Sequence, residues 1–315
     1  MDYVLNLFLL VLGFFFLIKG ADLFVDGSSS VAKIFKIPSV IIGLTIVSIG
    51  TSLPEAAVSI SASLKGAYDL SIANVVGSNI FNLLGVVGAS AIICPFVIDK
   101  VIMKRDFPIS ILSTMLLAVM LIDTTLSLVE AIILFILFIG YILLLVRSAL
   151  KNRSEDGEEY KTLSLPKSLL FIAIGIVAIV SGGTITVNAA TFFAEALGMS
   201  ELLIGLTIVA VGTSLPELVT SVVAAKKGES EIALGNVIGS NIFNILFILG
   251  MSGIVHPLNC EIGALIDTIL LIGMSLLMYF VCKTKSRVSR VEGYISVVIY
   301  VVYVVYIILR AYSIL

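Results

Sequence analysis

Two copies of one short segment place a glutamate beside residues that break helices. Gly50-Thr-Ser-Leu-Pro-Glu55 lies within one apolar stretch, and Gly212-Thr-Ser-Leu-Pro-Glu217 lies within another. Proline lacks an N–H and glycine permits unusual backbone angles, so we expect each helix to break here. We expect Thr51 or Ser52 to cap the helix that restarts after the first break. The carbonyls freed by a break cannot be satisfied by lipid, so they must face protein or a water-filled cavity, where they can bind a cation.

A second pair of segments supplies neutral oxygen atoms. The run Gly-Ser-Asn-Ile-Phe-Asn occurs twice and ends at Asn82 and at Asn244. In each copy the serine, Ser78 or Ser240, lies four residues before the final asparagine and therefore on the same face of a helix. The serines and the middle asparagines also suit a polar contact between closely packed helices. We interpret the final asparagines, with the two glutamates, as functional because polar groups at bilayer depth are costly.

The candidate ligands are all oxygen atoms. Calcium binds about six to eight oxygen ligands in flexible geometry, whereas zinc or copper would call for histidine or cysteine. The chain has one histidine and three cysteines, with no Cys-x-x-Cys pair. Two carboxylates neutralise one divalent or two monovalent cations, and a further sodium ion would rely on hydroxyl and amide oxygens. Such a site is disfavoured in the membrane when it is empty and charged, which favours exchange of ions over leak.

These segments belong to one internal repeat. Ile42–Glu55 recurs as Ile204–Glu217 with 12 of 14 residues identical, and Asn74–Asn82 recurs as Asn236–Asn244 at the same offset of 162 residues. A duplicated bundle could repeat only its packing positions, but here the matched residues include polar ones. We therefore expect two related halves joined by a linker. The expected segments are 1–150 with the signature 38–90, the linker 151–166, and 167–315 with the signature 200–252.

Ten apolar segments must position these residues. The chain is 59% hydrophobic and 13% charged, with a mean hydropathy of +1.19, which excludes a soluble globule. At about 20 apolar residues per membrane-crossing helix, its length has room for about ten crossings. We therefore predict an all-α polytopic membrane protein. The expected crossings are 4–32, 38–62, 70–94, 107–122, 126–147, 168–197, 202–225, 231–254, 261–282 and 293–313.

The arrangement of charge predicts the orientation of these crossings. Each half holds five crossings, so the second half enters from the opposite face, as in the inverted repeats of secondary transporters. With the N-terminus outside, 16 basic residues lie in cytoplasmic segments and two in external ones. We expect a multi-pass plasma-membrane protein with both termini outside and the linker in the cytoplasm. Asp22 and Asp26 in the first crossing are expected near its cytoplasmic end or along an access path.

At these motifs the sequence resembles the cation/calcium exchanger superfamily, most closely the prokaryotic, archaeal-type sodium/calcium exchangers. The resemblance spans both signatures, the ten-crossing layout and the linker. It implies Ca²⁺ held by Glu55 and Glu217 with the backbone carbonyls of Thr51 and Thr213. It also implies that the first and sixth crossings slide across the rest to alternate access. The Na⁺ ligands that it implies around the glutamates are the side chains of Ser52, Ser78, Asn82, Ser214 and Ser240 and the carbonyls of Ser48 and Ala210.

Asn244 ends the second Gly-Ser-Asn-Ile-Phe-Asn run and is also an expected Na⁺ ligand. Its residue type bears on which ions the protein exchanges. Some archaeal exchangers and the potassium-dependent ones have aspartate at this position, whereas the potassium-independent animal exchangers have asparagine. The chain therefore lacks a third carboxylate, which argues against potassium co-transport. Exchange of protons for calcium stays possible because Glu55 and Glu217 can themselves be protonated at bilayer depth.

The expected function is antiport of Na⁺ and Ca²⁺, without an enzyme active site. The alternatives are an antiporter driven by protons and a cation channel that uses the carboxylates as a selectivity ring. Channels usually arise from symmetric subunits around a pore, unlike an inverted repeat within one chain. An intramembrane hydrolase has little support because His256 lies outside the motifs. We expect no cofactor, no nucleic-acid partner and no obligatory protein partner; the expected contacts are Ca²⁺, Na⁺ and membrane lipid.

Overall fold

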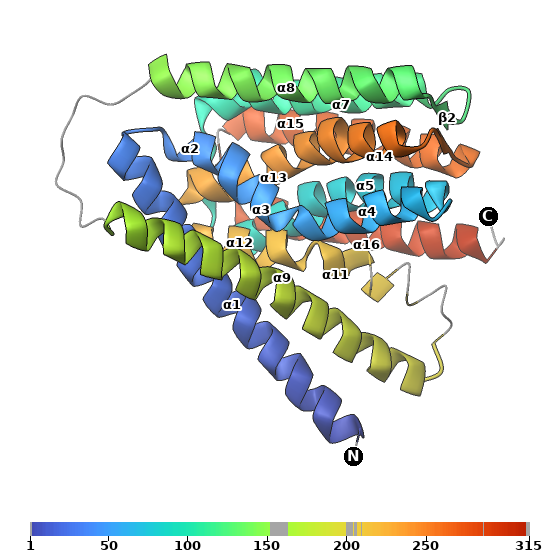
Figure 1. Cartoon of the computed structure of the whole chain (residues 1–315), viewed down its shortest axis with the longest axis horizontal. Helices are drawn as coiled ribbons and strands as arrows, with labels where there is room; N and C mark the ends of the chain where they lie inside the picture. The colour runs from blue at the N-terminus through green and yellow to red at the C-terminus, as the bar shows by residue number, and fades with distance from the viewer. Residues whose placement is uncertain are drawn as a thin grey trace.

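The chain folds into a bundle of helices with two short two-stranded sheets (Figure 1). The computed structural model describes residues 2–151, 163–199, 204, 207–208, 210–285 and 287–312. Most of the expected linker, residues 152–162, lies outside the described residues, as does part of the second signature near residues 200–209.

Most of the described elements are helices. The α-helices are α1 (Asp2–Phe35), α2 (Ser39–Ile42), α3 (Ser48–Thr51), α4 (Leu53–Leu64), α5 (Tyr68–Ile80), α6 (Val87–Ile93), α7 (Phe107–Met120), α8 (Leu128–Lys151), α9 (Leu165–Ala196), α11 (Ala210–Thr213), α12 (Leu215–Lys226), α13 (Ser230–Phe243), α14 (Gly250–Val255), α15 (Ile262–Lys285) and α16 (Arg290–Ala311). The π-helical segments are η1 (Gly43–Val47), η2 (Phe81–Val86), η3 (Ile102–Asp106) and η5 (Asn244–Leu249). The strands are β1 (Phe96–Val97), β2 (Thr125–Leu126), β3 (Leu258–Asn259) and β4 (Arg287–Val288).

The described helices are those of a multi-pass membrane protein. Seven segments are long and apolar enough to cross a membrane, and the bent pair Ser39–Thr51 with Leu53–Leu64 would make an eighth. The expected crossing 107–122 corresponds to α7, which has 14 residues. The expected crossing 202–225 begins among residues that are not described. The count of ten therefore stays a prediction.

Two of the long segments form the centre of the bundle. The apolar stretch of Tyr68–Ile93 is 78% buried and that of Ser230–Val255 is 94% buried, against 22% for the stretch in α1. These central segments carry the two Gly-Ser-Asn motifs, and α4 and α12, which carry the two glutamates, pack against them. The polar motifs therefore lie where protein, and not lipid, surrounds them.

Helices α1 and α9 form a long pair that diverges from the other helices (Figure 1). Glycines allow the two backbones to approach closely. A Cβ built on Gly20 would lie 2.9 Å from the Cβ of Ala178, and one built on Gly182 would lie 2.8 Å from the carbonyl oxygen of Gly13. Small residues at such contacts are typical of helix pairs in membranes.

The two sheets join the halves of the chain. β1 pairs antiparallel with β4, with Phe96 opposite Val288, and β2 pairs antiparallel with β3, with Leu126 opposite Leu258. β1 and β3 are 162 residues apart in the sequence, and so are β2 and β4. When the two halves of the chain are interchanged, the strand pair of one sheet therefore becomes the strand pair of the other. The end of α8 and the start of α9 lie on the side of the molecule opposite the start of α1 and the end of α16 (Figure 1).

The carboxylates of the first crossing are paired with the end of α12. Nζ of Lys227 lies 2.7 Å from Oδ1 of Asp26 and 3.5 Å from Oδ1 of Asp22. Farther along α1, Nζ of Lys33 lies 3.1 Å from Oε1 of Glu229, in the turn after α12. All five side chains are partly exposed, so these ion pairs fit the interfacial interpretation of Asp22 and Asp26.

Candidate ion-binding site

The chain bends at the first glutamate motif. α3 ends at Thr51, α4 begins at Leu53, and the two flanking segments meet at an angle of 50°. Pro54 lies in the first turn of α4, and because it has no N–H, the carbonyl four residues before it loses its helical donor. In the second motif, Ser214 separates α11 from α12 in the same way.

The hydroxyl groups at the two bends do not cap their own helices. Ser52 occupies the N-cap position of α4, but its side chain makes no capping hydrogen bond. The expectation that Thr51 or Ser52 caps this helix is confirmed for the position of Ser52 and wrong for the capping hydrogen bond. Oγ of Ser52 instead donates to Oε1 of Glu217 over 2.7 Å, and Oγ of Ser214 donates to Oε1 of Glu55 over 2.8 Å. Each half of the chain thus holds the carboxylate of the other half.

The two carboxylates are fully buried, and each accepts its hydrogen bond from the serine that lies three residues before the other glutamate. Each has one oxygen engaged by the crossed serine. The other oxygens, Oε2 of Glu55 and Oε2 of Glu217, have no hydrogen-bond partner among the described residues. An ionised carboxylate needs donors or cations around both oxygens when it is buried. The two oxygens without a hydrogen-bond donor can therefore serve as cation ligands.

The Gly-Ser-Asn motifs contribute buried neutral polar atoms. Oγ of Ser240 lies 3.5 Å from Oε1 of Glu217 and 3.4 Å from the carbonyl oxygen of Ser48. Oγ of Ser78 and both side-chain polar atoms of Asn82 are buried without a hydrogen-bond partner in the described part of the chain. Buried polar atoms are almost always satisfied in native proteins, so a group of unsatisfied ones indicates a place for a ligand or water.

The middle asparagines of the two motifs are structural. Nδ2 of Asn79 donates to the carbonyl of Asn241 over 3.1 Å, and Nδ2 of Asn241 donates to the carbonyl of Asn79 over 3.2 Å. Asn244 also donates, through Nδ2, to Oδ1 of Asn79 over 3.0 Å, while Oδ1 of Asn244 has no partner among the described residues. The sequence left two interpretations of Asn79 and Asn241, an ion ligand or a polar contact between helices. The structure contains the polar contact.

Most of the sequence-predicted residues are buried. Ser48, Thr51, Ser52, Ser78, Asn82, Ser214, Ser240 and Asn244 are buried together with the two glutamates. Thr213 is half-buried at the end of α11, and Ala210 begins that helix. The hydrogen bonds directly connect the glutamates to Ser52, Ser214 and Ser240.

Sequence reasoning missed two features of the site. The helices change to π-helix next to the final asparagines, because η2 begins at Phe81 and η5 begins at Asn244. Single π-helical turns are often found at functional sites, but no residue in either run signals them. The other missed feature is the pair of asparagines that open these motifs, Asn74 and Asn236, which contact the glutamate backbones.

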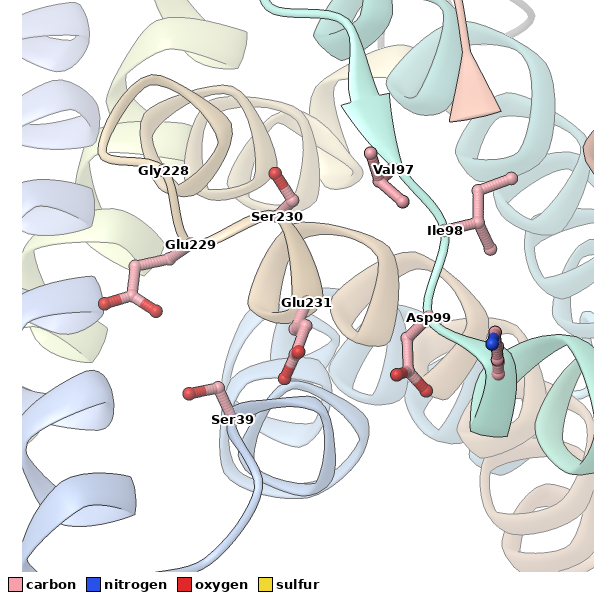
Figure 2. Close-up of a pocket in the computed structure, with 9 residues that line it drawn as sticks. Ser39, Val97, Ile98, Asp99, Gly228, Glu229, Ser230 and Glu231 are labelled. Carbon is pink, nitrogen blue, oxygen red and sulfur yellow. The ribbon is translucent and has the colours of Figure 1, made fainter. Parts of the chain in front are cut away.

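A second group of carboxylates lines an open pocket between helix ends (Figure 2). Glu231 accepts the backbone N–H of Val40 over 3.2 Å, and Asp99 accepts that of Val101 over 2.7 Å. Glu229 is directed towards α1, with which it is paired. The carboxylates of this pocket thus accept hydrogen bonds at helix ends, unlike the free oxygens at the bends.

Comparison with known proteins identifies the family. The model of the sodium/calcium exchanger protein family matches the chain twice, over residues 5–147 and 167–309. The chain belongs to this family. The resemblance inferred from the motifs is therefore confirmed.

Individual relatives cover most of the chain. The putative antiporter CaxA of Alkalimonas amylolytica is 41% identical over 261 residues, which are 81% of this chain and 82% of CaxA. The sodium/calcium exchanger MaX1 of Methanosarcina acetivorans is 37% identical, covering 94% of this chain and 96% of MaX1. A solved structure of the sodium-calcium exchanger NCX_Mj superposes with a TM-score of 0.84 at 36% identity, covering 96% of this chain and 99% of that one.

The crossed hydrogen bonds predict a specific pattern of energetic coupling. In a double-mutant cycle of Ser52→Ala with Glu217→Gln, measured by reversible unfolding in detergent without added cations, we expect a coupling of about 1.5–3 kcal/mol because the bond is made to a charged group. The cycle of Ser214→Ala with Glu55→Gln should give a similar value.

The matched control is the pair within one half. Ser52→Ala with Glu55→Gln should couple weakly, because no hydrogen bond joins these side chains in the structure. Equal coupling within and between halves would contradict the crossed arrangement.

Proposed function

We propose that the chain is a secondary antiporter that exchanges Na⁺ for Ca²⁺ across the plasma membrane by alternating access. The observation that carries this proposal is the pair of buried glutamates, each bonded to a serine of the other half and each with one oxygen free. Two carboxylates match the charge of one Ca²⁺ or two Na⁺. The family and the relatives support the choice of these ions.

In this proposal Ca²⁺ binds centrally. Oε2 of Glu55 and Oε2 of Glu217 supply two charged ligands, and the carbonyls of Thr51 and Thr213 supply neutral ones at the bends. Calcium accepts this mixture because it tolerates flexible oxygen coordination. Calcium binding would also remove the repulsion between the two carboxylates, which is strong in a medium of low dielectric constant.

Sodium ions would occupy the surrounding oxygens in place of Ca²⁺. Ser78 and Asn82 present buried polar atoms without partners, and Ser240 lies between Glu217 and the carbonyl of Ser48. The remaining sodium ligands of the proposal are Ser52, Ser214, Asn244 and the carbonyl of Ala210. The empty site leaves two like charges buried together, which makes passage without ions unfavourable and couples the two fluxes.

The proposed architecture is two inverted repeats of five helices, with breaks in the second and seventh crossings. The family model matches each half of the chain, and the strand pairings of the two sheets are related by interchanging the halves. Both observations support this arrangement. The proposal places both termini outside and the linker 151–166 in the cytoplasm. The opposite placement of the α8–α9 junction and the chain ends supports it (Figure 1).

The proposed movement is a sliding of α1 and α9 against the remaining helices. These helices pack mainly on each other and diverge from the bundle. Their joint displacement would expose the buried glutamates to one side of the membrane and then to the other. Ion binding can drive this change only by binding the two states with different affinities.

The two glutamates should be indispensable. We expect Glu55→Gln and Glu217→Gln each to reduce Na⁺-gradient-driven ⁴⁵Ca²⁺ uptake into proteoliposomes by at least about 100-fold, because each removes a charge that offsets Ca²⁺ in a buried site. Glu195→Gln, at an exposed position near the end of α9, is the matched control and should transport normally. Uptake by both glutamine variants at the wild-type rate would contradict the proposed site.

The driving ion can be tested with imposed gradients. We expect ⁴⁵Ca²⁺ uptake to follow an outwardly directed Na⁺ gradient and to be insensitive to K⁺, because Asn244 supplies no third carboxylate that would need an additional cation. A pH gradient in sodium-free medium should drive no uptake. Uptake driven by protons alone would favour the alternative of H⁺/Ca²⁺ exchange, and calcium flux without any counter-ion would indicate a channel.

A further inference from the structure

Two asparagines outside the ligand set make the same contacts in both halves of the chain. Nδ2 of Asn74 lies 2.9 Å from Oγ of Ser59 and 3.4 Å from the carbonyl oxygen of Glu55. Nδ2 of Asn236 lies 2.9 Å from Oγ of Ser221 and 3.4 Å from the carbonyl oxygen of Glu217. Each asparagine therefore contacts a serine and a glutamate carbonyl of its own half in the same geometry.

Each contact extends into a short chain of hydrogen bonds between neighbouring helices. Oγ of Ser59 donates to the carbonyl of Ser71 over 3.4 Å, and Oγ of Ser221 donates to the carbonyl of Ala233 over 3.3 Å. Each chain starts at the asparagine on the helix that carries a Gly-Ser-Asn motif, crosses to a serine on the helix that carries a glutamate, and returns to a carbonyl of the first helix. Both serines are buried, so water does not compete for these bonds.

The asparagines lie one helical turn from proposed sodium ligands. Asn74 precedes Ser78 by four residues on α5, and Asn236 precedes Ser240 by four residues on α13. Residues four apart lie on the same face of a helix. The asparagine therefore joins the backbone of the glutamate to the helix face that presents the neutral oxygens, and it sets the distance between the charged and neutral ligands.

Asn236 makes one further contact, which reaches the other half. Its Oδ1 accepts a hydrogen bond from Oγ1 of Thr51 over 2.9 Å. Thr51 ends α3 at the first bend, and its carbonyl is a proposed Ca²⁺ ligand. Asn236, which is fully buried, thus connects the backbone of Glu217 with the bend that lies beside Glu55.

We propose that Asn74 and Asn236 are positioning residues that fix the spacing of the ion ligands, with Asn236 also aligning the bend at Thr51 with Glu217. This inference rests on the proposed exchange of Na⁺ and Ca²⁺. Neither asparagine touches the ion. Groups that orient metal ligands from behind typically change metal affinity about 10- to 100-fold when they are replaced.

The test compares the Ca²⁺ dependence of transport in variants of this contact. In ⁴⁵Ca²⁺ uptake by proteoliposomes, we expect Asn236→Leu to raise the KM for Ca²⁺ about 10- to 100-fold, with kcat within about twofold, because ion binding is weakened and the later steps are kept. Asn74→Leu, which removes the contacts with Ser59 and with the carbonyl of Glu55, should also raise KM. Ser221→Ala, a milder change that keeps Asn236, should raise KM severalfold.

Ser63→Ala is the matched control. Ser63 is buried on the same helix as Glu55, and its Oγ donates to the carbonyl of Ser252 over 2.7 Å, away from the glutamates. It should lower the Tm without changing the KM for Ca²⁺ or the concentration of Na⁺ that halves uptake. A merely structural role for Asn236 would give the same pattern as Ser63→Ala.

The outcomes separate this inference from the proposed function. Normal exchange by the wild type, with an unchanged KM in Asn236→Leu and Ser221→Ala, would overturn the inference and leave the function intact. If Asn236→Leu does not fold, the KM of Ser221→Ala decides. A wild-type protein that shows no Na⁺-driven Ca²⁺ uptake would overturn the proposed function and the positioning role with it.

Discussion

Two fully buried carboxylates within an apolar helical bundle impose the main electrostatic constraint on this structure. Each is held by a serine from the other half of the chain, Ser52 for Glu217 and Ser214 for Glu55. Transferring an ionised carboxylate out of water is very unfavourable unless donors or cations surround it. The crossed serines satisfy one oxygen of each group, and the second oxygen is left for a cation. In the proposed function, a bound cation would offset the charge that the serines leave uncompensated.

The fold provides the conditions that this pair requires. The helix interruptions at Ser52 and Ser214 place the two hydroxyls that donate to the carboxylates of the opposite half. The buried segments 68–93 and 230–255 exclude lipid from the polar cluster. The two small sheets tie the halves together at symmetry-related places, so that ligands from different halves can keep a constant spacing. Asn74 and Asn236 add hydrogen bonds that act over shorter distances.

The sequence predicted the membrane class, the family, the position of the bend at Ser52 and the buried residues around it. These follow from local rules: proline interrupts a helix, and polar residues that recur in an apolar repeat need a common environment. The direction of a side chain depends also on residues that are distant in the sequence. Ser52 has the sequence pattern of a helix cap, but a carboxylate that is 165 residues away competes for its hydroxyl. The contact of Asn79 with Asn241 and that of Asn236 with Thr51 depend in the same way on residues from the other half, which local patterns do not reveal.

The most direct test of this account is the location of calcium in the protein. Crystals grown with CaCl₂ and measured at a long X-ray wavelength, where calcium scatters anomalously, would show the ion without reference to activity. The account predicts an anomalous peak at the centre of the bundle, within about 2.3–2.6 Å of a carboxylate oxygen of Glu55 and of Glu217. A calcium peak that touches neither glutamate, for example one confined to the pocket beside Asp99 and Glu231, would contradict it.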